Sequence, residues 1–390
     1  AGAPSARSST DASIGGYFAE LERMGLINRQ SGSKELLVAD IARAEHVLEA
    51  GDASLAATLL YGIVESPRYA DFSDFPEYQN AEYDLAVALA TSGAFEQAMV
   101  YLERLLLRGP SSLYWAAAHR RAVDIAGETQ QFGPILQRLE AVKMNEPILP
   151  GAAGERAYLR ARAAYAKGDL AAAEAELTKI GRQSRMYSSA LYLRGVIRAG
   201  RGAYTDATDA FCEVVDTPDD DKFSFFVDDR YFRLKDLARL GLGRIAHEQA
   251  RYDDAYYHYF QIPDDSDRLA EALFEGAWSM YQKRELDTSR DLIKELIDKY
   301  PGSRHLPEAL LLAGYVELAD CKFDAAQQRF DTVVARLQPI ANETRAIRES
   351  PERRRAGAAD RRGRERRPGR RPRRRPPRRR RRGGRRGRAP

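Results

Sequence analysis

Residues 300–339 read YPGSRHLPEALLLAGYVELADCKFDAAQQRFDTVVARLQP. Apolar residues recur at three- and four-residue steps on both sides of a short polar break, which is the spacing of one helix face. The stretch predicts a helix over Pro307–Asp320, a tight turn at residues 321–323 and a second helix over Asp324–Leu337. Pro307 suits a helix start, because the N–H that proline lacks has no partner there. Two helices of this length cannot bury their apolar faces alone, so similar neighbours are also predicted.

The same turn recurs along the chain, and one residue just inside the second helix marks each copy. Four of the upstream turns contain Gly followed by Asp or Ala. The markers lie 34 to 48 residues apart, as expected for a repeated unit with loop insertions. They are Ala56, Ala98, Ile135, Ala173, Ala207, Ala255, Ser289 and Ala326.

Similar residue types also recur at fixed distances from these markers. Twelve residues before them stand mostly small residues: Ala44, Ala86, Val123, Ala161, Gly195, Gly243, Ala277 and Gly314. Four residues after them stand larger apolar ones: Leu60, Leu102, Leu139, Leu177, Phe211, Tyr259, Ile293 and Phe330. Pro110, Pro147 and Pro301 close three units, and Pro339 stands near the same position in the last. This pattern resembles the tetratricopeptide repeat from roughly Glu35 to Pro339. The resemblance implies an all-α fold, a right-handed α-solenoid of about eight helix–turn–helix units.

Composition divides the chain into four segments. Residues 1–13, rich in Ser, Ala and Gly, are expected to be disordered. Residues 14–34 contain an amphipathic run that predicts a helix capping the first repeat. Residues 35–340 are expected to form the solenoid, and residues 341–390 to form a disordered tail rich in Arg, Pro and Gly.

The net charge of +5 combines two opposite contributions. Residues 351–390 hold 21 Arg and three acidic residues, a net charge of +18, so the rest of the chain carries −13. Such a tail cannot fold by burying apolar side chains. Three interpretations stay open: the tail binds nucleic acid or an anionic surface, it associates with the acidic solenoid, or it is an out-of-frame product of a GC-rich gene.

The residues offer no catalytic or metal-binding arrangement. The five histidines (His46, His119, His247, His258 and His305) are dispersed, without a paired or Cys/His spacing. Neither a phosphate-binding Gly-rich loop after a strand nor a Gly-x-Ser-x-Gly motif is present. Paired carboxylates are expected to be solvated charges on helix surfaces. Two cysteines are too few for a disulfide framework. The sequence therefore predicts no enzyme activity, no metal, no cofactor and no transmembrane segment.

The resemblance implies that the first helix of each unit lines a concave groove. Aromatic residues and Arg contribute most to binding hot spots, so a row of them would suit an extended or helical peptide. The alternative is that these side chains only pack between neighbouring first helices. The large residues expected in the groove are Tyr83, Arg120, Tyr158, Arg162, Tyr165, Tyr192, Arg244, His247, Phe274, Trp278, Tyr281 and Tyr315.

The longest insertion, Thr217–Lys235, carries five aromatic residues among five Asp. It is expected either to lengthen a first helix or to form a lip that contacts a partner.

The sequence thus predicts a non-catalytic scaffold or adaptor that binds a protein or peptide. The alternative is an adaptor held on nucleic acid or an anionic surface by its Arg-rich tail. Residues 300–310, Tyr-Pro-Gly-Ser followed by Pro-Glu-Ala-Leu, resemble envelope-associated repeats of Gram-negative bacteria. That resemblance implies a periplasmic or cell-envelope location, with a cytoplasmic one as the alternative.

Overall fold

The structure is a computed structural model that describes residues 32–142, 146–217 and 230–349. These residues form sixteen α-helices and one 3₁₀ helix and contain no β-strand, which confirms the all-α fold for the described part of the chain. Two compact units divide the chain, residues 1–283 and residues 284–390, and each is described by itself. The expected N-terminal segment, most of the capping helix, residues 218–229 of the long insertion and residues 350–390 lie outside the described residues.

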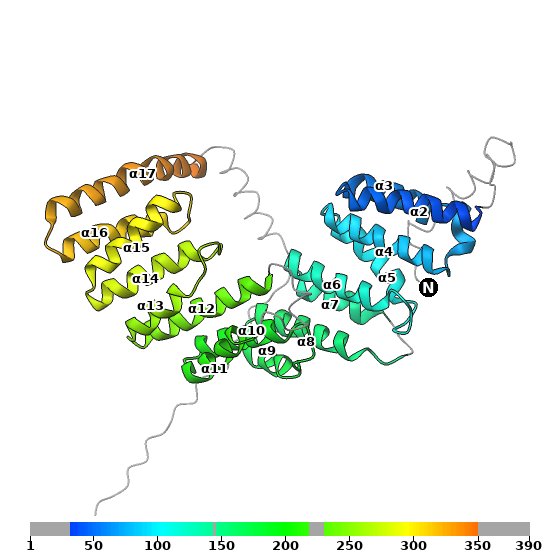
Figure 1. Ribbon diagram of the computed structural model, residues 1–390, viewed down its shortest axis with the longest axis horizontal. Helices are drawn as coiled ribbons and strands as arrows, with labels where there is room; N and C mark the ends of the chain where they lie inside the picture. Colours follow the sequence, from blue (N-terminus) through cyan, green and yellow to red (C-terminus); the bar gives the residue numbers. More distant parts are fainter. Residues whose placement is uncertain (1–31, 143–145, 218–229, 350–390) are drawn as a thin grey trace, which may run out of the picture. The chain divides into compact units, whose positions relative to one another are not determined.

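Helices follow one another as antiparallel pairs joined by short turns (Figure 1). The 3₁₀ helix η1 (Pro67–Phe72) connects the first pair to the second. The first unit contains α2 (Lys34–Glu49), α3 (Ala53–Val64), α4 (Pro76–Thr91), α5 (Phe95–Leu106), α6 (Trp115–Thr129), α7 (Phe132–Ala141), α8 (Pro150–Ala166), α9 (Leu170–Leu177), α10 (Tyr187–Gly200), α11 (Tyr204–Val215), α12 (Arg230–Glu248), α13 (Tyr252–Phe260) and α14 (Leu269–Lys283). The second unit contains α15 (Leu286–Lys299), α16 (Leu306–Ala319) and α17 (Phe323–Glu349).

Within the first unit, the helices stack in two layers. The first helix of a pair contacts the first helix of the next pair, as α2 contacts α4, α4 contacts α6, and α12 contacts α14. The second helix of a pair contacts the first helix of the following pair, as α3 contacts α4 and α13 contacts α14. The even-numbered helices therefore form one layer, and their surface is shared by neighbouring repeats.

The register read from the sequence is confirmed. Each of the eight markers is the fourth residue of its helix, from Ala56 in α3 to Ala326 in α17. All eight are at most 4 % exposed. A small side chain suits this position, because the two helices of a pair approach each other closely beside their turn.

In three repeats, the residue twelve positions before a marker packs against the residue four positions after it, and the two are matched in size. A Cβ built on Gly195, Gly243 or Gly314 would lie less than 3 Å from the ring of Phe211, Tyr259 or Phe330, respectively. At the buried residues Leu60, Leu102 and Leu177 the earlier residue is Ala, and at the buried Leu139 it is Val123. Glycine thus provides the space that an aromatic ring needs.

All eight turns between paired helices use the same left-handed residue. It stands five positions before the marker and has a positive φ, between 56° and 89°, in every turn. Glycine adopts this conformation without strain, whereas a residue with a Cβ is strained there by about 1–2 kcal/mol. The residues are Gly51, Gly93, Gln130, Gly168, Gly202, Ala250, Arg284 and Cys321.

The loop at residues 67–77 folds over the neighbouring helix α2. Tyr69 of η1 is 2 % exposed, and its hydroxyl donates a hydrogen bond of 2.7 Å to Asp40 Oδ2 on α2. Burial, the hydrogen bond to Asp40 and the charge of Asp40 raise the pKa of Tyr69 to about 12. The loop is therefore part of the packed first repeat.

The last helix is longer than its sequence predicts. Pro339 was expected to close the final unit, but α17 continues through it to Glu349. Proline removes the hydrogen bond to the carbonyl of residue 335, and its ring crowds that carbonyl. Residues 340–349 include good helix formers such as Ala341, Glu343 and Arg345, which favour continuation of the helix.

Candidate functional surface

The twelve residues predicted to line the groove all lie on first helices, and none of them is buried. Tyr165 and Tyr315 are 38 % and 39 % exposed, whereas neighbouring residues of the same helices, such as Leu159 and Val316, are fully buried. Tyr315 belongs to the second unit, where it packs edge-on against Phe330. The other eleven belong to the first unit and are called the first-helix surface below.

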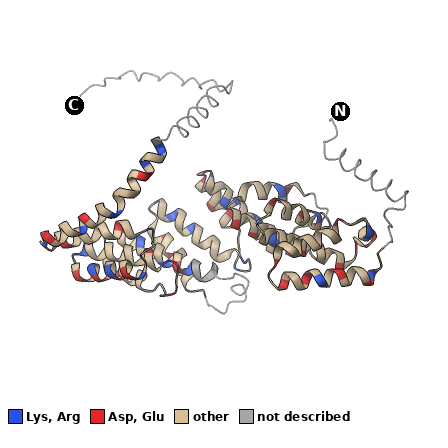
Figure 2. Cartoon of the chain, turned by 90° about the horizontal axis from the view of Figure 1, so that it is seen from above, with Lys and Arg blue, Asp and Glu red and all other residues tan. Residues whose placement is uncertain are grey.

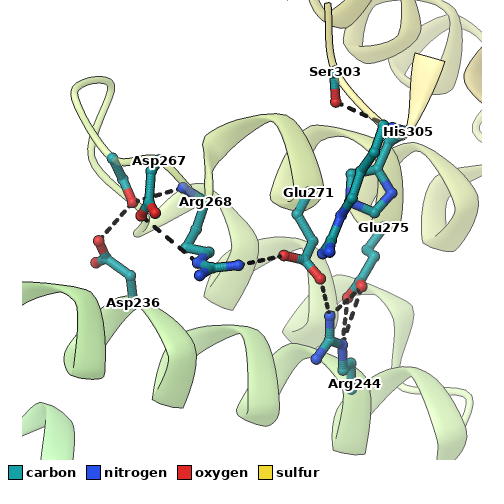
Figure 3. A network of polar contacts seen from close by, with 10 residues as sticks. Asp236, Arg244, Asp267, Arg268, Glu271, Glu275, Ser303 and His305 are labelled. Carbon is teal, nitrogen blue, oxygen red and sulfur yellow. Dashed lines mark hydrogen bonds and ion pairs between the residues drawn. The ribbon is translucent and has the colours of Figure 1, made fainter. Parts of the chain in front are cut away.

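The packing of α14 against α12 fixes Arg244 between two carboxylates (Figure 3). Arg244 Nη2 lies 2.7 Å from Glu271 Oε1, and Arg244 Nε lies 2.9 Å from Glu275 Oε2. Glu271 also accepts a hydrogen bond from Arg268. Burial by itself would lower the pKa of Arg244, but the hydrogen bonds and charges of Glu275 and Glu271 raise it. The guanidinium is therefore held charged and oriented.

Beside this ion pair, α12 carries an imidazole that is hydrogen-bonded to α14, and α14 carries aromatic rings. Ser279 Oγ donates to the carbonyl of Glu275 at 2.9 Å, so it accepts the 2.8 Å hydrogen bond from His247 Nδ1–H. His247 Nε2 is then the nitrogen with a free lone pair. On α14 the rings of Trp278 and Tyr281 lie 5.8 Å apart. Arg244, His247, Phe274, Trp278 and Tyr281 are called the α12–α14 patch below.

Two predicted residues of α8 contact each other. Arg162 Nη1 donates to the hydroxyl of Tyr158 at 3.3 Å and Nη2 to Gln130 Oε1 at 3.1 Å. The guanidinium of Arg162 also lies 4.2 Å from the centre of the Phe132 ring. Arg162 therefore joins α8 to the turn before α7, and part of its binding capacity is used within the fold.

Tyr83 belongs to a polar cluster that the sequence did not indicate. Its ring stacks on Tyr114 at 5.8 Å, and the Tyr114 hydroxyl donates to Asn80 Oδ1 at 2.7 Å. Asn80 Nδ2 donates to Glu45 Oε1 at 2.5 Å and to Asp84 Oδ2 at 3.1 Å. Burial, followed by the charge of Glu45, raises the pKa of Asp84 to about 6. The cluster joins α2, α4 and the start of α6.

Tyr192 and Arg120 complete the predicted set and are placed differently. Tyr192 is half-buried, its ring lies 5.7 Å from Phe211, and burial raises its pKa. Arg120 is exposed on α6, and its backbone carbonyl accepts a 3.2 Å hydrogen bond from Arg185. Tyr192 therefore contributes to packing as well as to the surface, whereas Arg120 is an exposed surface residue.

A buried ionic network links three repeats and was missed by sequence reasoning. Glu155, 5 % exposed, accepts a 2.7 Å hydrogen bond from His119 Nδ1 and another from Arg185 Nε. Arg185 Nη1 lies 2.7 Å from Asp124 Oδ1, 61 residues away in the sequence. Burial would raise the pKa of Glu155, but the hydrogen bond from His119 and the charge of Arg185 hold it below 4.5.

The hydrogen bonds of His119 indicate its tautomer. Arg156 Nε donates to His119 Nε2 at 3.2 Å, so Nε2 carries the lone pair and Nδ1 carries the proton. The indole of Trp115 stacks on the imidazole at 5.1 Å, and both side chains are fully buried. A ring enclosed in this way cannot reach a substrate, so the role of the network is to stabilise the fold.

The expectation that paired carboxylates are solvated is wrong for three glutamates. Glu82, Glu155 and Glu317 are 3 %, 5 % and 6 % exposed. Each is paired with an arginine: Arg108 for Glu82, Arg185 for Glu155 and Arg290 for Glu317. Burial of a charge is tolerated when a hydrogen-bonded partner of opposite charge is buried with it.

The described residues place no three His, Cys, Asp or Glu side chains where they could hold a metal ion together. Cys212 is half-buried and Cys321 is exposed, and both are free thiols. Over the same residues, every helix is too short or too polar to span a membrane.

Comparison with known proteins gives a family match and similar solved structures. Residues 47–121, from the end of α2 to the middle of α6, match the model of a family described as tetratricopeptide repeat. A tetratricopeptide repeat protein from Parabacteroides merdae ATCC 43184 is 14 % identical over 77 % of this chain and 92 % of that chain, with a TM-score of 0.35. The TPR domain of P58(IPK) is 15 % identical with the same coverage and a TM-score of 0.25. No curated protein matches the chain.

Proposed function

We propose, from the premise that the chain is built of tetratricopeptide repeats, that it is a non-catalytic scaffold for protein partners. The partner presents an extended or helical peptide segment, which binds along the first-helix surface. Within that surface, the α12–α14 patch is the main contact. The proposal goes beyond the general role in protein interaction that the repeats support.

The observation that carries the proposal is the composition of the patch. It combines three aromatic side chains, an arginine and a histidine, each of which keeps some surface exposed on two adjacent helices. Aromatic rings and arginine give a large binding area at a low cost in conformational entropy. Glu271 and Glu275 hold Arg244 in place before a partner arrives, so less side-chain freedom is lost on binding.

The electrostatics of the patch point to a partner segment recognised by shape and hydrogen bonds. Arg244 and Arg268 are balanced by Glu271 and Glu275, so the local charge is close to neutral. The lone pair of His247 Nε2 can accept a hydrogen bond from a backbone N–H or a hydroxyl of the partner. A segment with an apolar or aromatic anchor for Trp278 fits this chemistry best.

The test is a peptide library selected on the immobilised full chain. Peptides that bind the α12–α14 patch should lose at least about tenfold in affinity when Tyr281 or Trp278 is replaced by alanine. The matched control is Tyr257→Ala with Phe260→Ala on α13, which removes aromatic side chains that are 59 % and 71 % exposed on a second helix. The proposal is refuted if the selected peptides keep their affinity for the α14 variants but lose affinity for the control variant. Circular dichroism of each variant verifies that the helices persist.

The second candidate function is an adaptor on nucleic acid or an anionic surface. The 21 arginines of residues 351–390 favour it, because arginine binds phosphate oxygens with two parallel hydrogen bonds. Binding of a single-stranded oligonucleotide that requires residues 351–390 and weakens steeply with salt would support this function.

A cell-envelope location is proposed from residues 300–310 alone. Fractionation of cells that express the tagged protein tests it. Recovery of the protein with the cytoplasmic fraction would contradict the proposal.

A further inference from the structure

Ion pairs connect the second helix of one repeat to the first helix of the next, and they recur at the same register. Figure 2 shows basic and acidic residues interspersed along the described helices. Arg198 Nε on α10 lies 2.9 Å from Glu174 Oε1 on α9. Arg198 stands nine residues before its marker, and Glu174 stands one residue after the preceding marker. In the second unit Glu317 and Arg290 occupy the same two positions with the charges exchanged, and they also form an ion pair.

Moving about one helical turn along both helices keeps this register, because the two helices are antiparallel. The residue thirteen positions before a marker then lies opposite the fifth residue after the preceding marker. The pairing of α8 with α7 follows this rule, since Arg160 Nε and Nη2 lie 2.9 Å and 2.7 Å from Glu140 Oε1. In the next repeat the equivalent positions hold Arg194 on α10 and Thr178 at the end of α9.

The repeat of α9 and α10 therefore has the arginine of this pair without the acid. Arg194 is half-buried, and its Nε is enclosed without a hydrogen-bond partner in the part of the chain that the structure describes. Among the same residues, no carboxylate pairs with its guanidinium. A charged group that is partly removed from water and unpaired costs free energy. An oxyanion placed opposite Arg194 would lower that cost.

Thr178 is placed to carry such an oxyanion. It is exposed and follows the last residue of α9 with helical dihedral angles, φ −68° and ψ −18°. Its hydroxyl donates a hydrogen bond of 2.8 Å to the carbonyl of Ala175. A terminal oxygen of phosphothreonine is as many bonds from Cα as a carboxylate oxygen of glutamate. A phosphate on Thr178 thus reaches as far as Glu140 does, and its charge and acceptor oxygens suit an arginine.

The charges around Thr178 are complementary to a phosphate. Both acidic residues of α9 already have basic partners, so they leave the position of Thr178 open to another negative charge. With Arg194 included, four basic residues and two acidic ones give a net charge of +2, which a doubly charged phosphate would balance. The existing pairs are Glu174 with Arg198 and Arg201, and Glu176 with Lys179.

We propose that Thr178 is a phosphorylation site whose phosphate pairs with Arg194. A protein kinase transfers the γ-phosphoryl group of ATP to the hydroxyl. The Oγ1–P bond forms, the bond between the γ-phosphorus and the bridging oxygen breaks to release ADP, and the hydroxyl proton passes to the base of the kinase. Residues 178–186 lie between α9 and α10, so the hydroxyl stands at the start of a connecting segment. The phosphate gives this repeat the contact that Glu140 gives the preceding repeat permanently.

Thr178→Glu tests the pairing in the full chain. Its Tm should be about 1–3 °C above that of Thr178→Gln, which has the same length and no charge. In an Arg194→Gln background this advantage should disappear, because the negative charge at the C-terminal end of α9 then has no arginine opposite it. Glu140→Thr is the matched control, and it should lower the Tm by a similar amount. Equal Tm values for the Glu and Gln variants, or an advantage that persists without Arg194, overturn the pairing.

The modification itself is tested on the full chain purified from the cells that naturally produce it. Peptide mass spectrometry should locate a phosphate on Thr178. The contact is then measured by ³¹P NMR on a chain with phosphothreonine incorporated at position 178. Arg194 should hold the second pKa of this phosphate below its usual value of about 6, and Arg194→Gln should restore that value. A native protein without phosphate on Thr178 overturns the proposal, as does a phosphate pKa that is independent of Arg194.

Discussion

The ring of Phe211 lies so close to the backbone of Gly195 that a Cβ on residue 195 would be 2.6 Å from the ring carbon Cε1. The other side of the ring faces Gly241 of α12 at a similar distance. The ring therefore fills a space that exists only because two helices carry glycine at their crossing points.

We expect Gly195→Ala to destabilise the protein by about 1–3 kcal/mol, although alanine is the better helix former, because the new methyl group overpacks the core. Thermal and urea unfolding measure the change. Gly200→Ala on the same helix is the control: a Cβ there meets nothing within 4 Å, so it should be neutral or stabilising. Adding Phe211→Leu to Gly195→Ala should recover part of the loss, as in the repeats that pair Ala with Leu. Equal losses for both glycines would show that backbone effects, not packing, decide this position.

Ala250→Gly should stabilise the protein by up to about 1 kcal/mol, because Ala250 occupies a left-handed turn with a φ of 56°. The reverse change, Gly202→Ala, tests the same cause in another repeat, where φ is 77° and a Cβ meets no neighbouring atom. It should destabilise by a similar amount. Unfolding midpoints of the two variants should move in opposite directions, and a shift in the same direction would contradict the explanation.

Glu155→Gln should destabilise the protein most at neutral pH, by about 3–5 kcal/mol, because Arg185 then loses a buried charge partner. The folded-state pKa of Glu155 lies below its ordinary value of 4.5. The charged carboxylate thus contributes stability above about pH 4.5, which is lost as pH falls through the lower folded pKa. The difference in unfolding free energy between the wild type and Glu155→Gln should therefore become smaller at acidic pH. If this difference in unfolding free energy is constant from pH 7 to pH 3, the charge of Glu155 does not contribute to stability.

Asp84→Asn should have the opposite pH dependence. The pKa of Asp84 is raised from 3.8 to about 6, first by burial and then by Glu45, so its ionised form is unfavourable in the folded state. The wild-type protein loses stability as pH rises from about 4 through 6. Asparagine carries no charge, so the variant should be more stable than wild type at pH 7–8 and lose that advantage near pH 4. Equilibrium unfolding at pH 4 and at pH 7–8 measures the stability difference between this variant and the wild type. Glu45→Gln should reproduce part of the increase in stability at pH 7–8.

Sequence spacing was sufficient to predict the helix pairs, because the markers and their partners at −12 and +4 are fixed by one packing arrangement that every repeat shares. The buried glutamates could not be found in this way. Glu82, Glu155 and Glu317 stand 16, 18 and 9 residues before their markers, so they share no repeat position. Arg290 comes from the preceding repeat and Arg185 from the segment after its repeat, whereas Arg108 follows the second helix of the same repeat as Glu82. The three pairs therefore have no common periodic signal in one sequence.

The first-helix surface was predicted in outline and not in detail. Packing of first helices side by side explains why all the predicted residues keep some exposed surface. Which of them contact one another depends on short polar side chains such as Ser279 and Asn80, whose role is visible only once the helices are stacked. The position of Pro339 did not predict the end of the last helix, because α17 continues through it into residues that include good helix formers.

Arg185 gives the first unit an uneven resistance to stretching. Repeat proteins usually hold each unit only to its nearest neighbours, so under tension they can give way anywhere along their length. Here the side chain of Arg185 connects the loop before α10 to Glu155 on α8 and to Asp124 on α6. Pulled from its two ends, this unit should lose its outer helix pairs at low force, while the segment from α6 to α10 yields last and in a single step.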